Sequence, residues 1–271
     1  MPPSLCGTRD GVFYANCGDL AAQPKFAMRT LTAHEAVPGH HFQIALANEM
    51  EGLPYFRKAL AEFTAFVEGW GLYSERLARE LGFYATTYDP RPAARAAAAP
   101  ATSPVEGYDL LGHFGDELLR ASRLVVDTGI HAQGWGRQRA IDYMAANTML
   151  SPSDVVTEVE RYAVLPGQAC SYKVGALRIQ ALRDALSEEL GPPSPPSPEG
   201  RGGGKNESEN AHANRKKGAG GFDVRLFHRA MLEGGAVPLS TMEAHVSRRC
   251  REAAAANKEA GKEGGTTAEI Y

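Results

Sequence analysis

Apolar residues recur at intervals of three and four positions through most of this chain, and that spacing places them on one face of an α-helix. The clearest run begins after Pro54 and continues to Leu81, where Gly82 offers a cap. Periodicity and capping residues together predict further helices over 25–50, 152–164, 168–190 and from 222 onward. A chain patterned in this way is expected to fold as an all-α protein.

One short segment does not follow the helical pattern. Residues 11–16, which read Gly-Val-Phe-Tyr-Ala-Asn, are rich in aromatic side chains and are bounded by glycine and asparagine. Such a segment favours a single strand or one arm of a hairpin. We therefore expect one minor β element in an otherwise helical fold.

Composition divides the chain into one domain and three segments without a core-forming pattern. Residues 85–104 are rich in alanine and proline. Residues 192–221 contain PPSPPSPEGRGGGKNESEN, which has too few apolar side chains to offset the entropy lost on ordering. The sequence thus predicts a single domain over 1–252, with loop insertions at these two places and a disordered tail over 253–271.

Composition also excludes several classes of function. Of the 271 residues, 43% are hydrophobic, which is enough for a substantial core. The 29 basic and 32 acidic residues are mixed along the sequence and give a net charge of −3, so we expect neither nucleic acid nor an anionic membrane as a partner. No apolar run approaches the roughly 18 residues of a membrane span.

The cysteines are too widely spaced for a thiolate zinc site, and no two form a C-x-x-C pair. Their positions are Cys6, Cys17, Cys170 and Cys250. This distribution favours reduced thiols over a disulfide framework. We therefore expect a soluble protein in a reducing compartment, with the cytoplasm favoured.

The segment His34-Glu35-Ala36-Val37-Pro38-Gly39-His40-His41 carries the strongest chemical signal. In an H-E-x-x-H helix, two histidines one turn apart bind one zinc ion, and the glutamate beside the first activates water. Here proline occupies the position of the second histidine. We expect a kink or π-bulge at Pro38-Gly39 to bring His40, or alternatively His41, back beside His34.

A catalytic zinc site of this type needs a third protein ligand, and a carboxylate on another helix fits that role. Glu68 is the preferred candidate because it lies at the edge of a strongly apolar stripe, where a charged group is seldom buried without a partner. Glu62 and Glu75 are alternatives. Glu75, one heptad after Glu68, is also placed to orient a ligand histidine.

Successive blocks of this sequence resemble one known family. In order, they read HEAVPGHHFQ, FVEGWGLYSERL, RLVVDTGIHAQGW, ERYAVLPGQACSYKVGALRI and FHRAMLEGGAVPL. They are similar to blocks of the family catalogued as domain of unknown function 885, and the resemblance extends from about Gly11 to Leu239. That family is grouped by resemblance with helical zinc metallopeptidases of the neurolysin and thermolysin type.

The resemblance implies a metallopeptidase-like helical domain that hydrolyses peptide bonds with Zn²⁺. On this analogy the metal ligands are His34, His40 and Glu68, and the general base is Glu35. The family usually has a long helical region ahead of the H-E block. Because that block starts here at residue 34, we expect an N-terminally truncated domain that lacks one wall of the cleft.

Peptide hydrolysis also needs a hydrogen-bond donor to the developing oxyanion and contacts that hold the substrate. Tyr172, His131 and Arg161 are candidate donors because they lie in blocks whose polar residues have little evident core role. Arg161 and Gln168 are also candidate substrate contacts. The expected strand could pair with an extended peptide, which adds Tyr14 and Asn16 to the substrate contacts.

Two other functions remain open at this point. The chain could be a catalytically inactive member of the family that acts as a binding or scaffold module. It could also be a zinc hydrolase of amides or esters other than peptides. Metal content and a substrate screen distinguish these from a peptidase.

Overall fold

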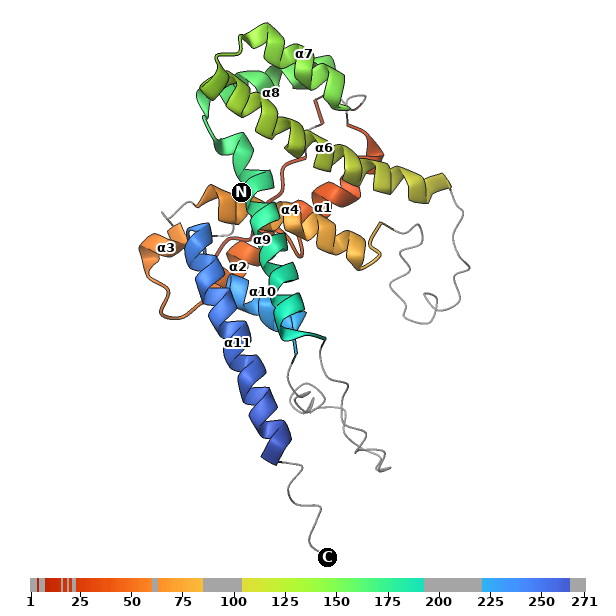
Figure 1. Cartoon of the computed structure of the whole chain (residues 1–271). Coiled ribbons are helices and arrows are strands. Elements are labelled where there is room, and N and C mark those ends of the chain that lie inside the picture. Colours follow the sequence, from red (N-terminus) through yellow and green to blue (C-terminus); the bar gives the residue numbers. More distant parts are fainter. Residues whose placement is uncertain are drawn as a thin grey trace, which may run out of the picture. The chain divides into compact units, whose positions relative to one another are not determined.

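The computed structural model describes residues 4, 8–15, 17–18, 20, 23–59, 63–84, 104–192 and 221–263, and all regular structure in these residues is helical (Figure 1). The all-α class is therefore confirmed. The helices, in chain order, are η2 (Lys25–Ala27), α1 (Met28–Glu35), α2 (His40–Glu49), α3 (Tyr55–Ala59), α4 (Thr64–Glu80), α6 (Pro104–Gln133), α7 (Arg137–Asn147), α8 (Pro152–Val164), α9 (Gln168–Leu190), α10 (Val224–Leu232) and α11 (Leu239–Glu263). None of the helices in these ranges combines the length and the apolar content that a membrane span needs.

The strand expected over 11–16 is wrong for the part that the structure describes. Residues 11–15 have no regular structure, and Asn16 lies outside the described residues. A strand is stable only where its backbone N–H and C=O groups bond to a neighbouring strand, and no described segment provides one. The aromatic side chains remain in contact with solvent instead, and 69% of Tyr14 is exposed.

The single helix expected over 25–50 is divided into η2, α1 and α2, and the expected kink at Pro38-Gly39 is a complete break. Residues 36–39 are not helical, and α2 begins at His40. Pro38 has no N–H with which to continue the helical ladder. Gly39 lies so close to α1 that a Cβ at this position would meet the His34 carbonyl oxygen at 1.8 Å. The chain therefore turns back and brings the start of α2 beside the end of α1.

The run after Pro54 also forms two helices, α3 and α4, instead of one. Phe63, immediately before α4, has a non-helical backbone with φ −102° and ψ 80°, which keeps the two apart. Gly82 follows α4 as the expected cap, because its φ of +75° lies in the left-handed region that glycine adopts most easily. The bounds expected from capping residues, 152–164 and 168–190, are confirmed by α8 and α9.

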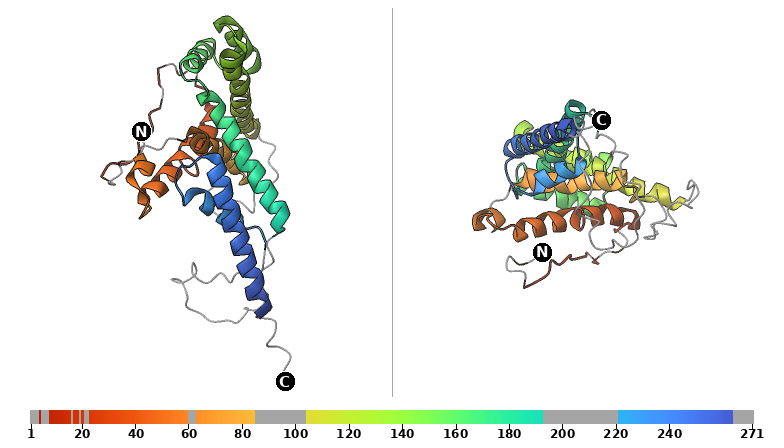
Figure 2. Two further views of the ribbon diagram at one scale, coloured as in Figure 1. Left: turned by 60° about the vertical axis from the view of Figure 1, so that its left-hand side comes forward. Right: turned by 90° about the horizontal axis from the view of Figure 1, so that it is seen from below.

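The described chain separates into two compact units. The first comprises Met1–Ile179 with Gly234–Leu239, and the second comprises Gln180–Glu233 with Ser240–Tyr271. In the first unit, α1 packs against α4 and α6, while α6, α7 and α8 pack against one another (Figure 2). The buried residues of this core, which also includes the start of α9, are Val126, Ala140, Met144, Val155, Val159, Tyr162 and Ala169.

The second unit contains the end of α9 together with α10 and α11. Helix α11 continues to Glu263, so the expected start of a disordered tail at 253 is wrong. The alanines at 253–256 favour helix, and Arg251 pairs with Glu189 of α9 at 2.7 Å, which helps to hold this part of α11 in place. Outside the described residues lie the rest of the tail and nearly all of the two expected insertions, at 264–271, 85–103 and 193–220.

Candidate metal centre

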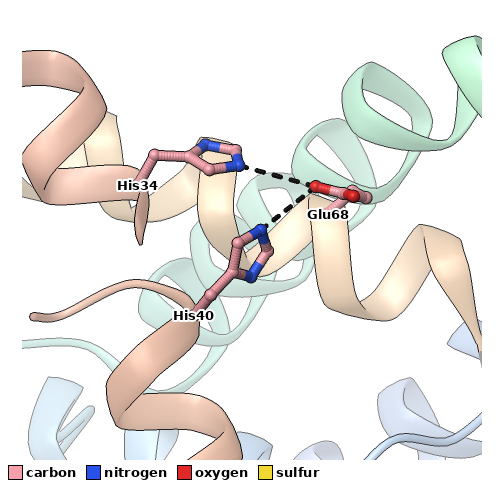
Figure 3. A group of neighbouring side chains, drawn as sticks. All are labelled: His34, His40 and Glu68. Carbon is pink, nitrogen blue, oxygen red and sulfur yellow. Dashed lines mark hydrogen bonds and ion pairs between the residues drawn. The ribbon is translucent and has the colours of Figure 1, made fainter. Parts of the chain in front are cut away.

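Two histidines and one glutamate meet where α1, α2 and α4 come together (Figure 3). His34 lies in the last turn of α1, His40 is the first residue of α2, and Glu68 lies near the start of α4. The Nε2 atom of His34 is 3.5 Å from Oε2 of Glu68, and Nε2 of His40 is 3.2 Å from the same oxygen. We call these three residues the ligand cluster.

The spacing within the ligand cluster fits a zinc ion. Zinc bonds of about 2.0–2.1 Å at tetrahedral angles place neighbouring ligand atoms about 3.3 Å apart. The two measured separations, 3.5 and 3.2 Å, lie on either side of this value, and all three ligand atoms lie within 4.8 Å of one another. Two imidazoles and one carboxylate are also the protein ligands of one class of catalytic zinc site, in which water takes the fourth position. Both the donor types and their separations therefore suit this metal.

Two glycines of α4 allow close approach, Gly71 of the two imidazoles and Gly69 of helix α9. Gly71 faces both imidazoles, and a Cβ there would lie 2.7 Å from Nε2 of His34 and 3.0 Å from Cε1 of His40. At Gly69, a Cβ would lie 2.6 Å from the Cα atom of Gly175, so α4 and α9 cross in close contact. A larger side chain at position 71 would therefore push the imidazoles apart.

His34 is oriented by two contacts outside the ligand cluster. Its Nδ1 atom lies 2.7 Å from Oε1 of Glu75, which is completely buried on α4. Its ring stacks on Tyr172 of α9, with the ring centroids 6.2 Å apart. The geometry thus agrees with the expectation that Glu75 orients a histidine, whereas the alternative ligand Glu62 lies outside the described residues. Because Nδ1 faces Glu75, Nε2 is the atom that faces Glu68.

The ligand cluster favours positive charge at its centre. Burial acts to lower the pKa of His34, but the carboxylates of Glu68 and Glu75 outweigh it and raise that pKa to about 9. Burial acts to raise the pKa of Glu68, whereas hydrogen bonds from His34 and His40 hold that pKa well below its usual range. A divalent cation bound to the same atoms would satisfy the carboxylate in place of these protons.

The two residues that adjoin the ligand histidines differ in exposure. Glu35, the expected general base, is half-buried at the end of α1 and makes no ion pair with another described side chain. His41, the alternative ligand, is exposed on α2, and the structure brings His40 to Glu68 instead. Glu35 therefore keeps an uncommitted carboxylate, one residue after His34 in the chain.

Three other predicted site residues form a connected row on α8 and α9. The hydroxyl of Tyr172 accepts a hydrogen bond from Nε2 of Gln168 at 3.4 Å, and Oε1 of Gln168 accepts one from Arg161 at 3.3 Å. Tyr172 is the member of this row that reaches the ligand cluster, through its stack on His34. The structure thus brings Tyr172, which is distant from the H-E segment in sequence, beside the ligand cluster, and links Gln168 and Arg161 to it.

The remaining predicted residues have other surroundings. The Nε2 atom of His131 lies 2.8 Å from the carbonyl oxygen of Tyr162 and 3.7 Å from Asp127, so its ring serves the contact between α6 and the end of α8. Tyr14 belongs to a segment without regular structure, and Asn16 lies outside the described residues. Because no strand forms at residues 11–15, the reason for assigning Tyr14 to an extended substrate is lost.

Two buried arginines of α6, which the sequence pattern does not single out as site residues, lie beside Tyr172. Arg120 and Arg123 are buried, and their guanidinium groups lie 5.9 and 4.7 Å from the ring centroid of Tyr172. Arg120 also pairs with Glu75 at 3.5 Å. The sequence does carry a signal for them, because Arg120, Arg123 and Asp127 recur at three and four positions on one helix face. Charged groups on a face that is buried need partners.

The chain is similar in fold to solved structures, whereas no curated protein matches it in sequence. A candidate lipoprotein from Colwellia psychrerythraea is similar at 37% identity and a TM-score of 0.72, and the match covers 92% of this chain and 34% of that chain. A candidate lipoprotein of unknown function from Shewanella oneidensis has a TM-score of 0.60 at 18% identity, which is a likeness of fold alone, and the match covers 87% of this chain and 35% of that chain. The chain thus spans about a third of the length of each of these proteins.

The family match agrees with the resemblance that the sequence blocks indicate. Residues 1–194 match the family described as bacterial protein of unknown function (DUF885). This range contains the ligand cluster and the first four of the five blocks. The chain therefore belongs to the DUF885 family.

Proposed function

We propose that this chain carries the zinc site of a hydrolase that cleaves peptide bonds, with His34, His40 and Glu68 as the metal ligands. The observation that carries the proposal is the position of one carboxylate oxygen 3.5 and 3.2 Å from imidazole nitrogens on two separate helices. These distances match the edges of a zinc tetrahedron. The donor types match those of catalytic zinc sites.

Two features separate the ligand cluster from an ordinary buried ion pair. The Nδ1 atom of His34 is hydrogen-bonded to the buried carboxylate of Glu75. Carboxylates in this position commonly orient zinc-bound histidines. Gly71 leaves room for both imidazoles on the same side of α4. Neither feature is needed for a simple ion pair, and both support a metal site.

The residues around the ligand cluster have assignable roles in hydrolysis. When bound, zinc polarises the scissile carbonyl and lowers the pKa of water to about 7. Glu35 directly follows His34, and we assign its carboxylate to accept a proton from the attacking water and to return it to the leaving amine. Because the Tyr172 hydroxyl accepts a hydrogen bond from Gln168, its own proton is available for the oxyanion. Arg161, at the end of the same row, is assigned to hold the substrate.

The decisive experiment combines metal analysis with one matched pair of variants. The purified protein is expected to hold one zinc ion per chain and to cleave peptides from a mixed library until a chelator is added. Glu35→Gln should lower kcat by about 10²–10⁴-fold without changing the zinc content. Glu51→Gln alters an exposed glutamate in a turn and should change neither property. Lack of stoichiometric zinc, or cleavage that Glu35→Gln leaves intact, contradicts the proposal.

The same measurements separate the other two functions. A binding or scaffold module would cleave no peptide in the library, whatever its metal content. A hydrolase of other amides or esters would cleave such compounds with the same dependence on chelator and on Glu35, while leaving peptides intact. The substrate class therefore follows from a parallel screen of peptide and non-peptide libraries.

The cytoplasmic location expected from the cysteine spacing stays a prediction. Fractionation of cells that produce the protein, followed by immunodetection, tests it directly. Recovery of the protein in a membrane fraction would contradict it.

A further inference from the structure

Helix α6 contributes no residue to the ligand cluster, yet one of its side chains touches both groups that hold His34. The Nη2 atom of Arg120 lies 3.5 Å from Oε1 of Glu75, the same oxygen that lies 2.7 Å from Nδ1 of His34. The guanidinium of Arg120 also lies 5.9 Å from the ring centroid of Tyr172, which stacks on His34. Arg120 is thus the common neighbour of the two contacts that orient the imidazole.

We infer that Arg120 is a positioning residue for the metal centre, which holds Glu75 so that the His34 imidazole presents Nε2 to the cation. Insofar as it concerns zinc, this inference rests on the proposed function. It assigns to α6 a role in the site although α6 lies outside the H-E segment and outside the helix that carries Glu68.

The burial of Glu75 explains why such a residue is needed. The carboxylate has no exposed surface, and its Oε2 atom has no hydrogen-bond partner among the described residues. A buried carboxylate is costly unless a cation compensates it. Arg120 supplies that cation, and its other arm is fixed by Asp116 at 2.6 Å. A continuous row of contacts therefore runs from Asp116 through Arg120 and Glu75 to the imidazole.

Removal of Arg120 should loosen the imidazole rather than remove a ligand. Without the guanidinium, the Glu75 carboxylate keeps only one partner and can turn away from the position that it now holds. The Nδ1 atom of His34 then loses its fixed acceptor. Loss of a group that orients a ligand histidine typically weakens metal binding by about 10–100-fold.

Arg123 provides a matched control on the same helix. It lies three positions after Arg120, is similarly buried, and its guanidinium also lies over the ring of Tyr172. Its charge partner, however, is Glu158 at 2.6 Å. Replacing Arg123 therefore removes a buried guanidinium and a contact with Tyr172 while leaving the pair with Glu75 in place.

The first experiment measures zinc affinity by competition with a chelator in the full chain. Arg120→Met should weaken zinc binding by about 10–100-fold, and Arg120→Lys, which restores the charge, should recover part of the loss. Arg123→Met should stay within about twofold of the wild type. Wild-type affinity in Arg120→Met, or an equal loss in Arg123→Met, would overturn the inference. If Arg120→Met does not fold, Arg120→Gln replaces it and should show the same loss.

The second experiment does not depend on zinc. In the metal-free protein, the proton that joins Nδ1 of His34 to Glu75 should exchange slowly with water in nuclear magnetic resonance spectra. Arg120→Met should make this exchange fast, whereas Arg123→Met should leave it slow. Fast exchange in both, or in neither, would overturn the inference. If the wild type binds no zinc, the proposed function fails while this measurement still decides the role of Arg120.

Discussion

Two buried groups of charged side chains in the first unit contain similar residue types. They differ in whether their buried polar atoms all have partners within the group. The ligand cluster joins two imidazoles and one carboxylate from α1, α2 and α4. The second group, which we call the Glu158 cluster, consists of Arg123, Glu158 and Tyr162 on α6 and α8. Both groups are largely removed from bulk water. In such surroundings an unpaired charge is costly.

In the Glu158 cluster the charges of Arg123 and Glu158 compensate each other. The Oε2 atom of Glu158 lies 2.6 Å from Nη2 of Arg123 and accepts a hydrogen bond from the Tyr162 hydroxyl, also at 2.6 Å. In the ligand cluster, by contrast, Nδ1 of His40 is buried with no hydrogen-bond partner among the described residues. There, two imidazole nitrogens converge on one carboxylate oxygen. A buried group whose charges pair with one another fits a structural role, whereas the arrangement of the ligand cluster supports the metal site proposed above.

The largest effect that this comparison predicts comes from loss of a ligand. His40→Ala should weaken zinc binding by on the order of a thousandfold, because one of the three proposed protein ligands is removed. His41→Ala removes the adjacent, exposed histidine and should leave the affinity within about twofold of the wild type. Chelator competition measures both. If His41→Ala loses zinc and His40→Ala keeps it, the ligand cluster is assigned wrongly.

A smaller loss is expected from a methyl group at Gly71. The added Cβ would lie 2.7 Å from the His34 ring and 3.0 Å from the His40 ring, so the imidazoles must separate. Gly71→Ala should weaken zinc binding by about 10–100-fold and lower the free energy of unfolding by about 1–3 kcal/mol. Gly136→Ala is the control, because a Cβ there has no neighbour within 4 Å. Chelator competition and urea unfolding of both variants test this. Equal zinc affinities in Gly71→Ala and the wild type would show that the site accommodates the added methyl group.

A change in the Glu158 cluster should lower the free energy of unfolding without changing metal binding. Removing one partner of a buried ion pair costs about 3–5 kcal/mol, and the partial exposure of the Glu158 side chain, 17%, reduces this to about 2 kcal/mol for Glu158→Gln. Zinc affinity should stay within about twofold of the wild type. Urea unfolding and chelator competition on the same samples measure the two quantities. A variant that loses zinc but not stability would reverse the roles assigned to the two clusters.

The helices could be predicted from the sequence where their ends depend on local residues. The hydroxyl of Ser151 caps α8, and Gly191 follows α9 with a φ of +73°, so both sets of bounds were accessible. A kink at Pro38-Gly39 was predicted, but not its extension to a complete break over 36–39, which depends on the close approach of Gly39 to the His34 carbonyl oxygen. The strand was predicted from aromatic residues bounded by glycine and asparagine, and such local signals do not supply a neighbouring strand.

The site shows the same division. The residue types and the family blocks point to His34 and Glu68, but the preference for His40 over His41 depends on how the chain turns before α2. Arg120 was missed because its partner, Glu75, lies 45 positions away in the sequence. Contacts between distant helices follow from packing, which residue spacing within one helix does not specify.

The smallest effect concerns pH and is confined to the Glu158 cluster. Burial acts to raise the pKa of Glu158, but the charge of Arg123 and the hydrogen bonds from Tyr162 and Arg123 outweigh it and lower that pKa. A carboxyl group whose pKa is lower in the folded state binds protons more readily when unfolded. Its contribution to stability is therefore complete above the unfolded pKa of about 4.3 and is lost as the pH falls through the folded value.

The stability difference between the wild type and Glu158→Gln should accordingly be constant near neutral pH and shrink below about pH 4. Every other carboxyl group titrates in both proteins, so the difference isolates Glu158. Urea unfolding of the pair between about pH 6 and about pH 3 measures it, and the change should be a fraction of the full effect of about 2 kcal/mol. A difference that stays constant to the lowest pH would mean that Arg123 and Tyr162 do not favour the charged form. The claim that the charges of the Glu158 cluster compensate each other would then be wrong, and so would the contrast with the ligand cluster.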